Sequence, residues 1–316
     1  VSAVGINSTT LPTKSWYTTA ANVTGGAKLN AEGDVLITSE EATNAKSDAQ
    51  GTSIGFAVSA DITKGENHIH TNNNITINAA IHAEGALTIT TASNASMLAR
   101  TIADGGGFFA SGTLKAINEL VRSSIITIEE ETELSANFGD LKISSNVGED
   151  DSIITYAKIT SGGVVSLGDV ETSLTLKNTA KVQVTGFKSI TNRFGTVKIR
   201  SNASQNGVDT YGSADCSGLG VAPDVKNTAR IVLTSQVNIS NPNGVIEGRY
   251  VYINSAINKL DVYSYGYAKG SGLGANIDSM NDLDTKLNSS VSVSGITIIG
   301  HDGAIINAST SPDYLD

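Results

Sequence analysis

Short runs in which apolar and polar residues alternate recur along the whole chain. Such runs predict β-strands that bury one face, and glycine, asparagine, serine and aspartate bound most of them. The clearest run reads Gly-x-(Val/Leu)-x-Ile and is followed by serine, threonine and asparagine. Its copies begin at Gly33, Gly85, Gly139 and Gly195, with looser copies at Gly248 and Gly303. These glycines are 52, 54, 56, 53 and 55 residues apart, so the sequence repeats about every 54 residues.

Two further markers recur with the same period. A glycine among small residues follows the first marker by 22 to 26 residues, at Gly55, Gly107, Gly163, Gly220 and Gly274. The segments Tyr211–Gly220 and Tyr265–Gly274 agree at seven of ten positions at an offset of 54. The third marker is an alternating apolar pair, found at Ile75/Ile77, Ile126/Ile128, Val182/Val184, Val237/Ile239 and Val291/Val293.

Short strands repeated at a fixed period predict an all-β fold, a parallel β-helix (solenoid) whose coils stack in register. We expect a single solenoid segment over residues 1–316, with repeats at approximately 21–72, 73–126, 127–182, 183–236, 237–290 and 291–316, the last one partial. We interpret each 54-residue unit as two coils plus an excursion, with three thinner coils as the open alternative. The two-coil interpretation gives roughly 11 or 12 coils and a rod about 55 Å long.

Two runs depart from strand periodicity. Apolar residues recur at helical spacing at Leu114, Ile117, Leu120 and Val121, and again at Met280, Leu283 and Leu287. Both runs follow the second marker of their repeat. They predict short helical or loop excursions packed on the flank of the solenoid, with partner binding by an amphipathic helix as the alternative.

Composition narrows the class of protein. Hydrophobic residues make up 39% of the chain, which is enough for a core, whereas 5% are aromatic and 16% charged. The net charge is −10 without a basic stripe, which disfavours nucleic-acid binding. One cysteine excludes an internal disulfide framework. The chain contains no run of 18 apolar residues, so it predicts no transmembrane segment. Its first residues lack a signal-peptide pattern, so we expect a fragment of a longer exported protein.

The repeat resembles the filamentous-haemagglutinin-like and leukotoxin-like adhesins of Gram-negative bacteria. The resemblance rests on the motif Gly33–Ser39, the alanines Ala42, Ala45 and Ala49 that follow it, and the glycines Gly105–Gly107. It covers essentially the whole chain and concerns a style of repeat, which autotransporter passenger domains share. It implies a right-handed β-helix, export to the bacterial outer-membrane cell surface or secretion, and an adhesive or toxin-associated role in virulence. It supplies no catalytic residues.

Parallel β-helices also include polysaccharide lyases and glycosidases, whose catalytic sites bring carboxylates together in one groove. Carboxylates cluster at Glu129, Glu131 and Glu133, and again at Glu149–Asp151. Either cluster fits the rim of a groove or a weak calcium site, but solvated turns explain both more simply. His68, His70 and His82 lack the further ligands of a metal site, and Cys216 aligns with Gly270, which indicates a small core or bend position.

We therefore expect no enzyme, with no catalytic, cofactor-binding or metal-binding residues and no cofactor; a carbohydrate-active enzyme is the alternative. The expected function is that of a structural stalk or passenger segment of a large surface adhesin or leukotoxin-type exoprotein. Its expected partners are a host cell-surface protein or glycan, or a neighbouring bacterial surface. Exposed tyrosines on a flat sheet suit such contacts. The candidate contact residues are Tyr211, Tyr265, Tyr267, Glu129, Glu131 and Glu133.

Overall fold

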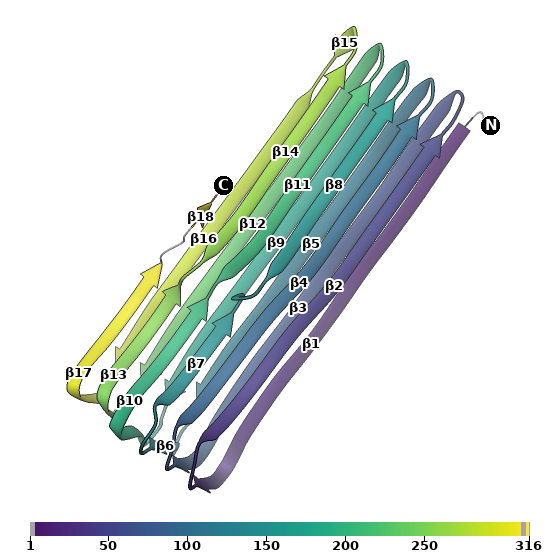
Figure 1. Ribbon diagram of the computed structural model, residues 1–316. Coiled ribbons are helices and arrows are strands. Elements are labelled where there is room, and N and C mark those ends of the chain that lie inside the picture. Colours follow the sequence, from purple (N-terminus) through teal and green to yellow (C-terminus); the bar gives the residue numbers. More distant parts are fainter. Residues whose placement is uncertain (1–3, 311–313, 316) are drawn as a thin grey trace.

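The computed structural model describes residues 4–310 and 314–315; residues 1–3, 311–313 and 316, which include the end of the partial repeat, lie outside the described residues. The described chain is all β, without a helix, and its 18 strands join in one sheet. Every strand pairing in it is parallel. The fold is therefore the parallel β-helix that the period-2 runs predict (Figure 1).

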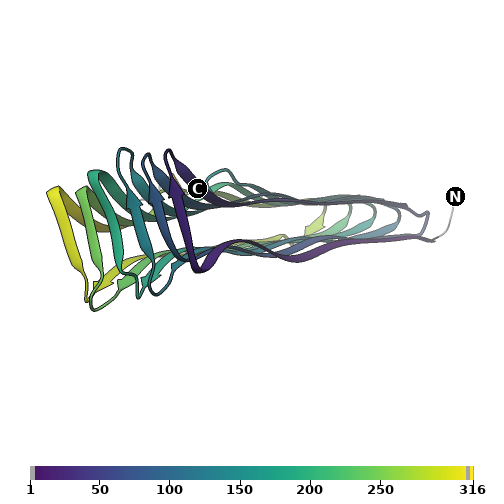
Figure 2. The ribbon, with the colours of Figure 1, turned by 90° about the horizontal axis from the view of Figure 1, so that it is seen from below.

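The sheet winds into a flattened wedge (Figure 2). Strands of one layer, face A, run from the narrow end to the wide end: β1 (Val4–Ala31), β3 (Val58–Ala83), β5 (Phe109–Ile128), β9 (Val165–Thr185), β12 (Gly220–Ser240) and β16 (Asp278–Ser294). Strands of the other layer, face B, return: β2 (Val35–Ile54), β4 (Leu87–Gly106), β7 (Leu141–Val147), β8 (Ser152–Gly162), β10 (Ser189–Ala203), β11 (Gln205–Ser217), β13 (Val245–Ile257), β14 (Leu260–Ser271), β17 (Thr297–Thr310) and β18 (Tyr314–Leu315).

The two ends of the wedge differ. At the wide end, β6 (Glu133–Ala136) pairs with the last residues of β3 and the first residues of β10, and these segments make a short third side. At the narrow end the two faces join through tight turns, next to which lies the short β15 (Gly274–Ala275). Each coil therefore crosses from one end of the wedge to the other and back.

The strand register confirms the first and third sequence markers and corrects the number of coils. It also corrects the second marker, because Gly220 pairs with Val165 and the glycine that stacks on Gly163 is Gly218. The apolar pairs of the third marker stack directly, as Ile75 on Ile126 and Ile126 on Val182. Successive coils meet at offsets such as Asn67 with Asn118 and Leu120 with Leu176, so one coil consumes one whole repeat. Both the two-coil and the three-coil interpretations are wrong.

This correction changes the expected shape. About six coils stacked at 4.8 Å give a height of about 29 Å, whereas a 26-residue strand such as β3 extends about 85 Å. The segment is a plate broader than it is high, and the expected 55 Å rod is wrong for these residues.

The predicted helical excursions are also wrong. Leu114 and Leu120 are buried in β5, and Met280, Leu283 and Leu287 belong to β16. The alternation in β5 is hidden because two of its inward positions carry the polar residues Asn118 and Arg122 while outward Ile117 and Val121 are apolar. A polar residue in the interior therefore produced the false helical spacing.

The interior changes in character from the wide end to the narrow end. Isoleucine, leucine and valine fill the wide end, as at Ile89, Leu141 and Ile199. Alanines dominate near the narrow end, where the two faces approach each other, as at Ala99 and Ala214. Cys216 is fully buried there, as expected for a small core residue, and burial raises the pKa of its thiol. The taper of the wedge thus follows the volume of the inward side chains.

Polar side chains tie the two faces together between the apolar clusters. Asn67 Nδ2 donates to Leu98 O at 2.8 Å, from face A to face B, and to Asn118 Oδ1 at 2.9 Å in the next coil. Asn118 repeats the arrangement with Ile154 O at 2.8 Å. Towards the wide end, serines cross in the same way, for example Ser235 Oγ to Ser201 O at 2.9 Å. These bonds satisfy buried groups and fix the spacing between the layers.

We expect Asn227→Ala to lower the free energy of unfolding by about 2 kcal/mol. Asn227 Nδ2 lies 2.9 Å from Asn281 Oδ1 and 3.0 Å from Ser264 Oγ, and its Oδ1 accepts the hydroxyl of Thr172. Removal of the amide leaves the buried hydroxyl of Thr172 without its acceptor and breaks the link to Asn281 and Ser264, which keep their hydrogen bond to each other. Denaturant unfolding measures the loss. Asn238→Ala, on the outer side of β12, is the matched control, and an equal loss in both variants would contradict the role of the cross-layer bonds.

Candidate contact surface

A ladder of tyrosines runs across the outer side of face B. Tyr156 in β8, Tyr211 in β11 and Tyr265 in β14 occupy matched register positions. Their ring centroids are 5.0 and 5.4 Å apart, and successive ring planes differ by 9° and 18°. Neighbouring strands lie about 4.8 Å apart, so near-parallel rings at this spacing must overlap face to face. The rings therefore stand upright on the sheet.

Two further tyrosines widen the ladder along its last strand. Tyr263 and Tyr267 flank Tyr265 in β14, with centroids 6.2 and 6.3 Å from it and planes within 12° and 11° of it. The three side chains are 44%, 37% and 40% exposed in the order Tyr263, Tyr265 and Tyr267. Because residues two apart in a strand point to the same face, the three rings form an upright row. We call the five tyrosines the tyrosine surface.

Charged groups border the tyrosine surface. Asp209 pairs in register with Tyr263, and burial, with the charge of Asp261, raises the pKa of its carboxyl. Asp215 lies 3.4 Å from Lys269 Nζ, an exposed ion pair worth less than about 1 kcal/mol. The surface thus offers aromatic edges and hydroxyls within a rim that contains both signs of charge, a composition typical of protein and glycan contacts.

The candidate tyrosines Tyr211, Tyr265 and Tyr267 lie together, but sequence reasoning missed Tyr156 and Tyr263. Tyr156 could have been found, because Thr155-Tyr156-Ala157 aligns with Thr210-Tyr211-Gly212 at an offset of 55. Tyr263 could have been recognised from its spacing of two residues from Tyr265.

The candidate glutamates lie elsewhere, at the wide end: Glu129 and Glu131 in the turn between β5 and β6, and Glu133 at the start of β6. Glu131 has φ +62°, the left-handed region that non-glycine residues rarely adopt. Lys188 Nζ lies 2.7 Å from Glu131 Oε2 and 3.4 Å from Glu133 Oε1, and the hydrogen bond with Glu131 raises the pKa of the ammonium. These two glutamates and Lys188 line a recess of about 270 Å³, and Glu129 lines a neighbouring one. The glutamates and the tyrosines do not form one site.

The second acidic cluster is not the rim of a groove. The side chain of Asp151 is fully buried and forms an ion pair with Arg122, whose side chain is also fully buried. Asp151 Oδ1 also accepts the backbone N–H of Ala95 at 2.8 Å. Glu149 accepts a hydrogen bond from Asn202 Nδ2 at 2.7 Å. Both interpretations of Glu149–Asp151, the favoured solvated turn and the groove rim or calcium site, are therefore wrong for Asp151.

The three candidate histidines fall into two groups. His68 Nδ1 lies 2.7 Å from Glu119 Oε2 and His70 Nε2 lies 3.4 Å from Glu119 Oε1 on the outer side of face A. The contact with His68 lowers the pKa of Glu119. His82 contacts Ser135 and Glu84 instead. Within residues 4–310, histidine, cysteine, aspartate and glutamate form no group of three or more that could hold a metal ion.

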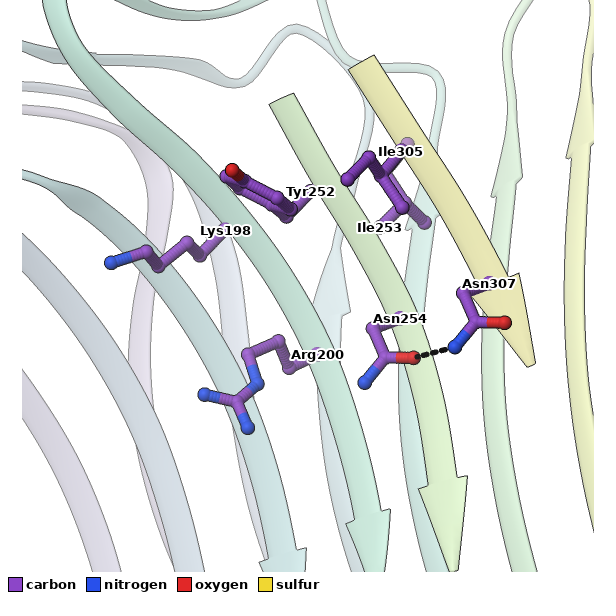
Figure 3. A pocket seen from close by; sticks show the side chains of 7 residues that line it. All are labelled: Lys198, Arg200, Tyr252, Ile253, Asn254, Ile305 and Asn307. Carbon is purple, nitrogen blue, oxygen red and sulfur yellow. Dashed lines mark hydrogen bonds between the residues drawn. The ribbon is translucent and has the colours of Figure 1, made fainter. Parts of the chain in front are cut away.

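A shallow recess of about 360 Å³ lies on face B beside β17 (Figure 3). Lys198 and Arg200 border it from β10, and Tyr252 and Asn254 from β13. Asn307 Nδ2 donates to Asn254 Oδ1 at 3.4 Å, and Lys198 Nζ lies 2.6 Å from Asp140 Oδ2. Arg200 brings a positive charge to a wall of amides and an aromatic ring, which favours an anionic group at this recess.

Comparison with protein-family models, with curated proteins and with solved structures finds no match to the chain. The part of the chain that the structure describes contains no helix able to span a membrane. The resemblance to bacterial surface adhesins thus stays a prediction from the repeat.

Proposed function

We propose that this chain is a structural and binding segment of a large secreted or surface-displayed bacterial adhesin or leukotoxin-type exoprotein. The observation that carries the proposal is the tyrosine surface, which gathers five aromatic side chains from three successive coils on one flat face. The expected partner is a host cell-surface protein or glycan, or a neighbouring bacterial surface. Stacked coils hold these side chains in place, so contact costs little side-chain entropy.

The mechanism is mechanical and additive. Parallel ladders between coils resist local opening because each strand of the inner coils bonds to both neighbouring coils. Hydroxyls and ring edges that repeat along the stack can each make a weak contact, and tethered weak contacts reinforce one another through effective concentration. Tyrosine suits this role because it supplies area and a hydroxyl with only two side-chain torsions.

We expect the double variant Tyr263→Ser/Tyr267→Ser to bind its partner at least about tenfold more weakly than the natural chain. The variant removes the two flanking rings and leaves the stacked ladder of Tyr156, Tyr211 and Tyr265 in place. The measurement is binding to an array of host glycans and extracellular-matrix proteins, followed by titration of each ligand that is retained.

The matched control is Tyr250→Ser, which removes a half-buried tyrosine of β13 outside the tyrosine surface. Control and natural chain should bind alike. Binding of the double variant that equals that of the natural chain would remove the tyrosine surface from the proposal. If the natural chain retains no ligand on the array, the binding part of the proposal fails and only the structural part stands.

A further inference from the structure

The turns at the narrow end carry an apolar residue in every coil. In each turn it follows a glycine that stacks on the glycine of a neighbouring coil. In chain order these residues are Phe56, Phe108, Val164, Leu219 and Leu273. Four of the side chains are 79%, 52%, 57% and 91% exposed, in the order Phe56, Phe108, Leu219 and Leu273. The turns lie side by side along one edge of the plate (Figure 1), and we call the five residues the apolar ridge.

The turns that carry the apolar ridge contain no charge. They span residues 54–58, 106–110, 162–166, 217–221 and 271–275, and none of these positions holds an acidic residue, a basic residue or a histidine, although 16% of the chain is charged. Further apolar side chains flank the ridge, such as Ile54 at 73% exposure and Phe109 at 48%. An exposed apolar strip of this kind marks a contact with a protein or a membrane.

The backbone of these turns forms hydrogen bonds from coil to coil. Phe108 N donates to Phe56 O at 3.3 Å. Leu219 N donates to Val164 O at 2.9 Å, and Gly274 N donates to Leu219 O at 2.8 Å. Unpaired backbone groups are what keeps most turns out of lipid, because water is missing there as a partner. The ladder between turns lowers that cost for the apolar ridge.

Charged residues begin a short distance behind the ridge. On face A, Asp169, Asp224 and Asp278 stack in register and are exposed. On face B, Asp215 lies 3.4 Å from Lys269 Nζ. These positions are four or five residues from the ridge residue of their own turn, about 15 Å of strand. The apolar edge is therefore deep enough for the interfacial region of a bilayer and too shallow for its centre.

The dimensions of the ridge disfavour a second copy of the chain as its occupant. Five turns spaced by about 4.8 Å span about 20 Å, and the edge is about 10 Å thick. Contact between two such ridges would bury about 400 Å² in total, whereas a specific interface buries about 1,200–2,000 Å². Binding to a bilayer scales with the buried apolar area and needs no surface of matching shape.

We propose that the apolar ridge inserts into the interfacial region of a lipid bilayer, so that the plate stands edge-on at the membrane. A zwitterionic lipid surface is the expected occupant, because the net charge is −10 and the turns supply no cation for anionic headgroups. The tyrosine surface lies on the outer side of face B, apart from this edge. The inference therefore goes beyond the proposed function, whose partner is a protein or a glycan.

The test is flotation of the whole chain with phosphatidylcholine vesicles. We expect the natural chain to float with the vesicles, and Phe56→Ser/Leu273→Ser to lower the partition coefficient at least about tenfold, because the variant removes the two most exposed ridge side chains. Phe138→Ser/Phe194→Ser is the matched control, since these side chains are 79% and 60% exposed near the wide end, and it should float like the natural chain. All four positions are exposed, so both variants should fold, as circular dichroism checks.

Tryptophan emission locates the part of the chain that meets the lipid. The single tryptophan, Trp16, lies within β1 about 40 Å from the narrow end. Its emission in the natural chain should not change when vesicles containing brominated lipid are added. In Trp16→Phe/Phe56→Trp the tryptophan lies on the ridge, and its emission should shift to the blue and be quenched by the brominated lipid.

A natural chain that does not float with the vesicles would overturn the proposal. Flotation that needs phosphatidylserine and weakens with salt would overturn it in favour of an electrostatic contact. Equal flotation of the natural chain and Phe56→Ser/Leu273→Ser would place the lipid contact elsewhere. Sedimentation that shows a dimer, with Phe56→Ser/Leu273→Ser a monomer, would assign the ridge to a second copy. Each outcome is independent of whether the tyrosine surface binds a partner.

Discussion

Replacement of Arg122 by leucine should lower the free energy of unfolding by about 3–5 kcal/mol. The side chains of Arg122 and Asp151 are fully buried, so the substitution strands the carboxylate of Asp151 in the interior with the Ala95 N–H as its remaining partner. Arg122 Nε also donates to Asn178 Oδ1 at 2.9 Å, which links this coil to the next. Denaturant and thermal unfolding measure the loss, and hydrogen exchange locates it among the coils.

The matched control is an ion pair of the same kind at the surface. Arg100 Nη1 lies 3.6 Å from Asp48 Oδ2, and the arginine side chain is 39% exposed. We expect Arg100→Leu to cost less than about 1 kcal/mol, because water and salt screen an exposed pair. A loss for Arg122→Leu no larger than that of the control would contradict the assignment of Arg122 as an essential buried partner.

The chain itself contains the design for a rescue. Arg122 stacks on Asn178, which stacks on Leu233. On the opposite layer Gln205 stacks on Leu260, and Asn178 Nδ2 donates to Gln205 Oε1 at 2.9 Å. In three successive coils, the same cross-layer position therefore holds an ion pair, an amide pair and finally two leucines that belong to one apolar cluster. Arg122→Leu/Asp151→Leu copies the last form and should recover most of the stability that either single substitution loses.

The mixture of apolar and polar residues in the interior explains which parts of the fold the sequence could predict. Alternating apolar pairs such as Ile75 and Ile77 gave the strand type and register, because a 54-residue repeat stacks each pair on its own copy. The length of the strands was hidden, because inward polar residues such as Asn67 and Thr71 interrupt the alternation. The markers around one circumference therefore favour two coils and an excursion over the single coil that the structure has.

The candidate sites show the same division. Stacked tyrosines follow from register, so Tyr211 and Tyr265 were predictable from the repeat. The burial of Asp151 was not, since an acidic residue in the turn between β7 and β8 gives no sign that its side chain points inward until the facing strand is known. Contacts between the two layers join residues without a common period, such as Arg122 and Asp151. Pairing across the interior is therefore the part that a single sequence does not contain.

The turns at the narrow end stack so closely that an added methyl group there should destabilise the fold. We expect Gly163→Ala to lower the free energy of unfolding by about 2–3 kcal/mol, the upper part of the range for a single substitution. A Cβ on Gly163 would lie 2.2 Å from the carbonyl oxygen of Gly107 in the preceding coil. Gly218 meets Gly163, and Gly272 meets Gly218, at the same distance. The turns therefore stack through a ladder of glycines. Gly107 and Gly163 are predicted markers, whereas Gly218 and Gly272 lie two residues before the predicted markers Gly220 and Gly274.

The backbone must move away from the added methyl group, and the movement strains the hydrogen bonds that the turn makes with both neighbouring coils. Gly163 N donates to Ser217 O at 3.0 Å and Gly107 N donates to Gly162 O at 3.2 Å. Gly220→Ala is the matched control, because a Cβ there meets no atom within 4 Å and its φ is not positive. The control should change stability by less than about 1 kcal/mol, with stabilisation the expected sign. Equal stability of the two variants in denaturant unfolding would show that the turns have room to separate, and would remove the glycine ladder as the reason that these positions recur.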